Sequence, residues 1–223
     1  MKIKRPSILA IVTKDVLVEI RSKEVVTPVI VFSSLVIVLC DFVFDPGVDS
    51  SHVASGVLWV ALTFGGILGF GRLFGMEREN GTFTGLVLAP VGREILLCGK
   101  IISGFLFITL VEIVMLPVFS LLFDLPIFLP WLWVIVLVTT AGFSIIGTIF
   151  SIITVHGRAR EVMLPILFFP VAIPVIICAV QATQIVLSGG SWNQVDHLIG
   201  LIVAFDVVFL GLGISMAGFL LGE

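Results

Sequence analysis

Charged side chains are scarce in this chain. Only 12% of its 223 residues are Asp, Glu, Lys or Arg, whereas 59% are hydrophobic. Soluble domains carry charge on roughly a quarter of their residues, so a protein whose surface faces water is excluded. The mean hydropathy of +1.26 indicates a lipid environment instead. Almost nothing is left to face solvent, and no nucleic-acid partner is expected.

The sequence also lacks a nucleotide-binding motif. A phosphate-binding loop of the form G-x-x-x-x-G-K-[ST] surrounds phosphates with backbone amides and uses a hydroxyl to hold magnesium. The one Gly-Lys pair is Gly99-Lys100, where Ile101 replaces that hydroxyl and Gly92 lies too far upstream. We therefore predict no ATPase site in this chain, so that energy for any work would come from a partner.

Cysteine is equally sparse. Cys40, Cys98 and Cys178 lie far apart without metal-ligand spacing, so we expect them to be small apolar residues of helices. No metal site and no catalytic residue are predicted, because no nucleophile–base pair occurs at a compatible spacing. A cleavable signal peptide is not expected, since the apolar stretch before Lys14 is short and no small-residue cleavage site follows.

Long apolar stretches are what the chain does contain. A helix needs roughly 20 apolar residues to cross a hydrocarbon core, and its backbone must satisfy its own hydrogen bonds there. The sequence thus predicts an all-α integral membrane protein with six transmembrane helices. The spans are about Val25–Phe44, Val53–Met76, Ile95–Phe123, Pro130–Thr154, Val162–Leu187 and Leu198–Leu221.

The cations are absent from one side of these spans. All 12 Lys and Arg residues precede the first span, or lie in or near the connections that six spans bring to that same side, which the positive-inside rule makes cytoplasmic. We therefore expect both termini in the cytoplasm. The opposite connections are short and hold acidic residues, and all four tryptophans map near that side, as in an aromatic belt.

Residues 1–24 form a cytoplasmic segment ahead of the transmembrane domain, 25–223. Within it, residues 6–23 have the periodicity of an amphipathic helix lying in the membrane interface. Its apolar positions are Ile8, Ile11, Val12, Val16 and Ile20, and its charged positions are Lys14, Asp15, Glu19, Arg21 and Lys23. A partly ordered tail is the alternative.

The first cytoplasmic connection, about 77–94, has the most distinctive content. Asn80-Gly81 is a typical helix stop, Thr82 could cap a short apolar helix, and Pro90 would end it. This pattern fits a docking element for a partner; the alternative is an ordinary loop on lipid headgroups. The residues predicted to make the contact are Glu77, Arg78, Glu79, Gly81, Phe83, Leu86, Leu88 and Pro90.

Other charged residues lie in a second connection and inside the spans. Arg158, Arg160 and Glu161 could form a second cytoplasmic contact, with a partner or with lipid headgroups, or a solvated face. Glu112 and Asp206 lie within the third and sixth spans, where a carboxylate is costly. They either line a polar route for substrate or protons or hydrogen-bond to a neighbouring helix.

Four segments resemble the heme exporter B (CcmB) family. They are LWVALTFGGILGFGR (58–72), GRLFGMERENGT…LVLAPVGREILLCGK (71–100), LPVFSLLF (116–123) and GRAREVMLPILFFPVAIPVI (157–176). The resemblance extends over roughly residues 10 to 210. The combination of the ERENG and GRAREVMLP segments is far more specific than hydropathy.

The resemblance implies a fold of the ABC-2 (type V exporter) kind, with an interfacial elbow helix, six spans and a coupling helix in the first cytoplasmic loop. It implies a permease of cytochrome c maturation in the bacterial inner membrane, working with a second copy of itself, a CcmA-like ATPase, CcmC-like and CcmD-like heme-handling subunits and a heme carrier. ATP would be bound by the partner, and heme would be a substrate rather than a cofactor.

Two histidines acquire a possible role from this resemblance. His52 and His197 fall in outer connections and could be transient axial ligands of heme iron, or ordinary loop histidines. For the whole chain, the alternatives are a generic ABC-2 permease for lipid, polysaccharide or drug, and a non-transporting scaffold of a heme-handling assembly.

Overall fold

The computed structural model describes residues 8–43, 50–79, 81, 85, 91–126, 128–154, 157 and 159–220. This part of the chain is all-α, which confirms the predicted fold class. Its helices are α1 (Ile8–Ser22), α2 (Val26–Val43), α3 (Ser50–Glu79), α5 (Arg93–Phe123), α6 (Pro130–Thr154), α7 (Arg160–Leu187) and α8 (Trp192–Leu220). All except α1 are long and apolar enough to span a membrane.

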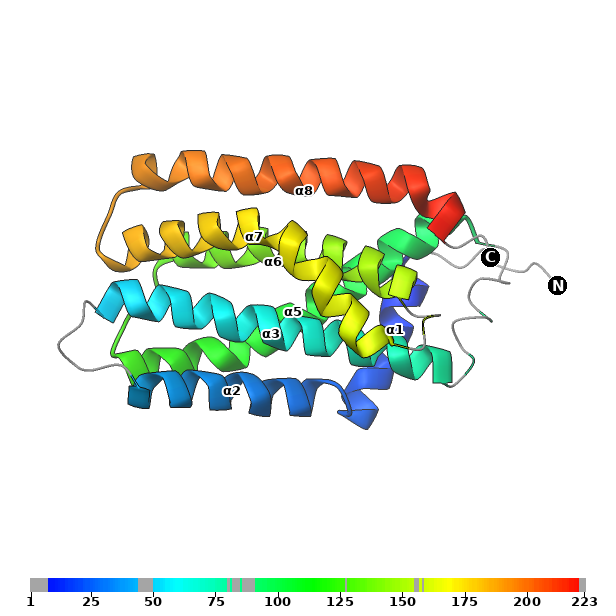
Figure 1. The fold of residues 1–223 in the computed structure, drawn as a ribbon, viewed down its shortest axis with the longest axis horizontal. Coiled ribbons are helices and arrows are strands. Elements are labelled where there is room, and N and C mark those ends of the chain that lie inside the picture. The colour runs from blue at the N-terminus through cyan, green and yellow to red at the C-terminus, as the bar shows by residue number, and fades with distance from the viewer. Residues whose placement is uncertain are drawn as a thin grey trace.

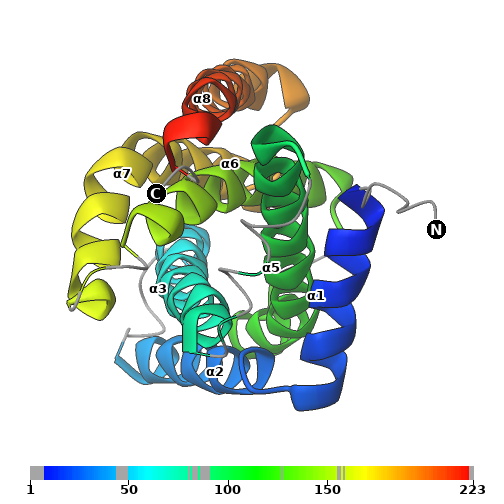
Figure 2. The same ribbon diagram turned by 90° about the vertical axis from the view of Figure 1, so that its right-hand side faces the viewer.

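The six long helices lie side by side, and α1 crosses one end of the bundle (Figure 1). We call this the α1 end, and the opposite end the far end. Viewed along the bundle, α6 lies among α5, α7 and α8, while α2 and α8 lie at opposite edges (Figure 2). The helices α3 and α6 are the most buried of the six, and they therefore form the centre of the protein.

The surface of the bundle is apolar. Leu39 on α2, Ile166 on α7 and Val207 on α8 are each more than 60% exposed, and many other large aliphatic side chains also face outward. Such a surface would be a liability in water, whereas in a bilayer it is the solvated face. The protein is therefore an integral membrane protein, with six spans in the part of the chain that the structure describes.

Glycines allow the central helices to approach closely. The fully buried ring of Phe70, on α3, lies between Gly104 of α5 and Gly147 of α6. A Cβ atom at Gly104 would come within 2.7 Å of this ring, and one at Gly147 would overlap it. The absence of both side chains thus makes room for one large aromatic ring.

The tryptophans are divided between the far end and the interior. Trp131 and Trp192 stack with ring centroids 4.2 Å apart where α6 and α8 begin. Trp59, however, is completely buried and donates its indole N–H to the hydroxyl of Thr183, 2.9 Å away. The expectation that all four tryptophans form an interfacial belt is therefore wrong for Trp59, because a polar partner on α7 allows its ring to be buried.

A tight corner joins α1 to α2. Lys23 has a left-handed backbone with φ of 54°, and its N–H donates to the carbonyl of Glu19 over 2.8 Å. The Glu19 carboxylate in turn accepts the backbone N–H groups of Val25 (3.1 Å) and Val26 (2.7 Å). The last turn of α1 therefore caps the start of α2, and this capping helps to hold α1 crosswise.

Candidate functional site

The most unusual site lies where α1 crosses the bundle. Helix α3 ends at Glu79 and α5 begins at Arg93, so both helices end beside the connection that the sequence predicts as a docking element. As predicted, the chain turns after α3: Gly81 has a left-handed φ of 66°, and its N–H donates to the carbonyl of Arg78 over 3.0 Å. Helix α1 packs against α5 at this same end.

Four charged side chains from these three helices form what we call the charged cluster: Lys14 and Asp15 of α1, Glu77 of α3 and Lys100 of α5. Lys14 lies 2.8 Å from Asp15 and 2.9 Å from Glu77. Lys100 lies 3.0 Å from Asp15 and also donates a hydrogen bond to Glu77. Each cation thus contacts both anions, and the formal charges sum to zero.

Three side chains of the cluster, those of Asp15, Glu77 and Lys100, are largely buried, whereas that of Lys14 is 39% exposed. The Lys100 side chain is only 2% exposed, although it lies about 10 Å along α5 from the start of that helix. The aromatic ring of Phe74 lies beneath it, with the ammonium group 5.7 Å from the ring centroid, within cation–π range. A buried charge that loses its partner costs several kcal/mol, so the four groups depend on one another.

Electrostatics within the cluster favours the charged forms of its α1 members. Burial alone would raise the pKa of Asp15, but the positive charges of Lys100 and Lys14 outweigh it and hold that pKa below its usual value. Burial would lower the pKa of Lys14, yet Glu77 and Asp15 raise it above its usual value. Both side chains are therefore ionised at neutral pH.

Local packing explains why α1 can approach so closely. Gly99 precedes Lys100, and a Cβ atom there would lie 3.0 Å from the side chain of Ile11. Ile11, Asp15 and Glu19 are the buried residues of α1, and their spacing of four residues places them on one face. The Gly99-Lys100 pair, which does not fit a nucleotide-binding loop, thus provides a contact surface for α1 and a cation for the cluster.

The structure places the predicted docking residues in different situations. Glu77 is 9% exposed and faces the charged cluster, whereas Arg78 and Gly81 are exposed. The side chain of Glu79 and the residues Phe83, Leu86, Leu88 and Pro90 lie outside the described residues. The predicted docking contact stays a prediction, in which Glu77 would act from inside the protein.

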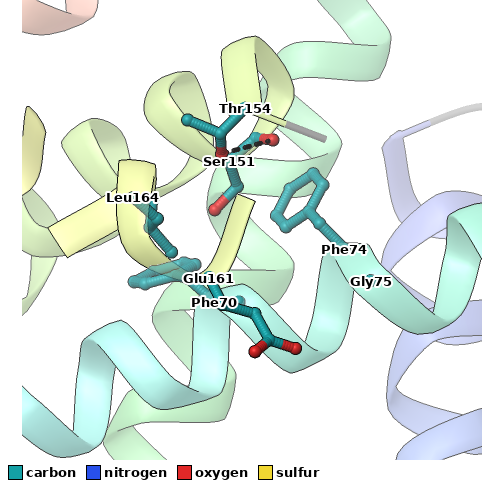
Figure 3. A pocket seen from close by; sticks show the side chains of 8 residues that line it. Phe70, Phe74, Gly75, Ser151, Thr154, Glu161 and Leu164 are labelled. Atoms are coloured by element: carbon teal, nitrogen blue, oxygen red, sulfur yellow. Dashed lines mark hydrogen bonds between the residues drawn. The ribbon is translucent and has the colours of Figure 1, made fainter. Parts of the chain in front are cut away.

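The second predicted contact is described only in part. Arg158 and the side chain of Arg160 lie outside the described residues, and Glu161 is exposed. Glu161 lines a small pocket with Ser151 and Thr154 of α6 and Phe70 and Phe74 of α3 (Figure 3). The pocket holds about 20 Å³, enough for one water molecule.

Glu112 and Asp206 are buried separately. Glu112 is 1% exposed and accepts a hydrogen bond from the hydroxyl of Thr140 on α6. Asp206 lies against Gly142 of α6, where a Cβ atom would overlap its carboxyl group. Thr140 and Gly142 are about 200° apart around α6. The two carboxyl groups therefore contact opposite faces of α6 and do not form one pair.

The two outer histidines are both exposed and belong to different helices, α3 for His52 and α8 for His197. His197 lines an open cavity of about 560 Å³ between α7 and α8, together with Gln181, Gln184 and Gln194. A heme contact at either histidine stays a prediction. Among the described residues, no group of three or more His, Cys, Asp and Glu side chains could hold a metal ion.

Sequence reasoning missed the charged cluster. It placed Asp15 with the polar residues of an interfacial helix and counted Lys100 only as a cytoplasmic cation. Two signals were present: Lys100 follows a run of apolar residues in its span, and Ile11, Asp15 and Glu19 recur every four residues. A lysine inside a span requires an anionic partner, but the sequence does not tell which carboxylate supplies it.

Comparisons with known proteins agree with the resemblance. The model of the family described as CcmB protein matches residues 6–218. Heme exporter protein B of Pseudomonas aeruginosa is 30% identical over 76% of this chain and 76% of its own length. Heme exporter protein B of Rhodobacter capsulatus is 28% identical over 78% of this chain and 81% of its length. That of Haemophilus influenzae is 30% identical, covering 77% and 78%.

Proposed function

The chain belongs to the CcmB family, and on that premise we propose that it is the permease subunit of an ABC-type assembly for heme export in cytochrome c maturation. A separate, CcmA-like ATPase would supply the energy. CcmC-like and CcmD-like membrane subunits, a heme carrier and a second copy of the chain would complete the assembly. Heme is the expected substrate, as the name of the relatives indicates.

The observation that carries this proposal is the charged cluster. It joins α1 to the two helices that flank residues 80–92, the predicted docking element. A force applied there by an ATPase would move the end of α3 and the start of α5. Because Asp15 contacts Lys100 and Lys14 contacts Glu77, α1 would move with both helices. Closure of the ATPase would thus be converted into movement of a three-helix unit.

This proposal also fixes an orientation. The α1 end carries the charged cluster and Arg93, which donates to the carbonyl of Gly218 near the end of α8. By the positive-inside rule this end lies in the cytoplasm, in the bacterial inner membrane, with both termini on that side. The ATPase would approach from there, since ATP is cytoplasmic.

A charge reversal on the exposed part of the docking element tests the proposal. Arg78→Glu should reduce co-purification with the ATPase, or its stimulated ATP hydrolysis, by at least about tenfold, because charge complementarity at an interface is replaced by repulsion. Arg72→Glu is the matched control: it makes the same change at an exposed position of α3, about 240° away around the helix. Normal association and cytochrome c assembly in Arg78→Glu would contradict the docking role.

Two further measurements separate the alternatives. A strain that lacks the chain should fail to assemble c-type cytochromes, whereas loss of a generic exporter would leave assembly intact. A strain with a catalytically inactive ATPase partner should show the same defect. Normal assembly in that second strain would instead favour a non-transporting scaffold.

A further inference from the structure

A cavity of about 430 Å³ lies beneath α1, in the angle that this helix makes with α2, α3 and α5. We call it the α1 cavity. Its walls are mainly apolar and include Val16 and Ile20 of α1 and Leu106, Phe107 and Leu110 of α5. Because it extends from Ser103 to Leu110, it runs about 10 Å along α5.

The cavity opens sideways, toward the membrane. Phe107 and Ser103 form its buried floor, whereas Ile20, Leu106 and Leu110 at its edge are 60%, 42% and 44% exposed. The last two belong to a membrane-spanning helix, so the opening faces lipid rather than water. An apolar cavity open to a bilayer is filled by what surrounds it, which here is hydrocarbon.

The charges at the rim determine which head group suits the cavity. Three charged residues line it. Asp15 is paired within the charged cluster, and Glu19 accepts two backbone N–H groups. The ammonium group of Lys23 is exposed and forms no ion pair or hydrogen bond with any described residue. The uncommitted charge at the rim is therefore positive.

The apolar walls, the opening toward the membrane and the positive charge at the rim together match the chemistry of a phospholipid. We propose that the α1 cavity is a binding site for a phospholipid, with one acyl chain between α1 and α5 and the phosphate group at Lys23. The positive charge of Lys23 complements an anionic head group, because the two carboxylates of the lining, Asp15 and Glu19, already have partners within the protein. The bound chain would support α1 from the membrane side, where the charged cluster does not reach. This inference does not depend on the transport function proposed above.

The test is a titration of the purified full-length chain with phosphatidylglycerol, with bound lipid counted by native mass spectrometry. The wild-type chain should bind one lipid more tightly than all others. Lys23→Asn should weaken that step about fivefold, as expected for one lysine near an anionic lipid. Asparagine is chosen because it tolerates the left-handed backbone of the corner, so the change removes the charge and preserves the turn.

A second pair of variants tests the position of the acyl chain. Leu106→Trp fills the cavity and should abolish the tight step, whereas Leu35→Trp places the same ring on a lipid-facing position of α2 that does not line the cavity and should preserve it. Leu110→Trp, at the other end of the cavity, serves if Leu106→Trp does not fold. Equal lipid counts in all variants, with no effect of Lys23→Asn, would mean annular lipid only and would overturn the proposal.

Discussion

Two pairs of buried acids in this protein are stabilised differently. At the α1 end, Asp15 and Glu77 share two lysines in a balanced cluster of ion pairs. Inside α5, Glu112 accepts a hydrogen bond from the hydroxyl of Thr140. Inside α8, Asp206 lies against Gly142. Neither of these two forms an ion pair with any described residue.

This difference indicates which carboxyl groups must be ionised for the fold to be stable. A carboxylate that pairs with a buried lysine is required as an anion, because its loss removes a charged partner from a buried cation. A carboxyl group surrounded by apolar side chains and a hydroxyl needs only its shape and one hydrogen bond, since a charge there would be costly. We therefore expect loss of charge to be severe in the cluster and mild at Glu112.

The largest effect should come from removing the buried cation. Lys100→Met removes the most deeply buried cation from Asp15 and Glu77, and should lower the free energy of unfolding by about 3–5 kcal/mol. This loss in the free energy of unfolding is measured by titrating the protein from mild into denaturing detergent. The double variant Lys100→Met/Glu77→Gln removes one charge of each sign and should recover most of the loss. A double variant as unstable as Lys100→Met would show that packing, and not charge balance, holds α1.

A smaller effect is expected where α6 contacts Asp206. Gly142→Ala introduces a Cβ atom that overlaps the Asp206 carboxyl group, and should cost roughly 1–3 kcal/mol in the same titration. Asp206→Ala in that background should relieve the loss, because it removes the overlapping group. Gly200→Ala on α8 is the control, since nothing lies within 4 Å of the added Cβ. An equal loss at both glycines would exclude the contact with Asp206 as the cause.

Glu112→Gln should change stability by less than about 1 kcal/mol, because the amide oxygen can still accept the hydrogen bond of Thr140. Asp15→Asn is the comparison, and should cost clearly more because both lysines lose a charged partner. Glu112→Gln also tests a role for Glu112 in moving protons. If cytochrome c assembly is normal with Gln at this position, that role is excluded.

The sequence predicts the parts of the fold that depend on local pattern. Apolar runs indicate the six spans, and Asn80-Gly81 indicates the end of α3. The charged cluster was not predictable in the same way. Lys14 and Glu77 are 63 residues apart, and Lys100 and Asp15 are 85 apart. Periodicity tells which residues share a face of one helix, but not which helix covers that face.

The smallest expected effect is that of pH on stability within the physiological pH range. The lysines lower the pKa of Asp15, so this residue stabilises the fold above the unfolded value of about 3.9, and the contribution is lost as pH falls through the lower folded value. Lys14 has a raised pKa, and its contribution is present below about 10.4 and lost at higher pH. The stability difference between wild type and Asp15→Asn should therefore be constant from about pH 5 to 9 and shrink below about pH 4. A difference that changes steadily between pH 5 and 9 would mean that another group controls the cluster, because neither Asp15 nor Lys14 titrates in that interval.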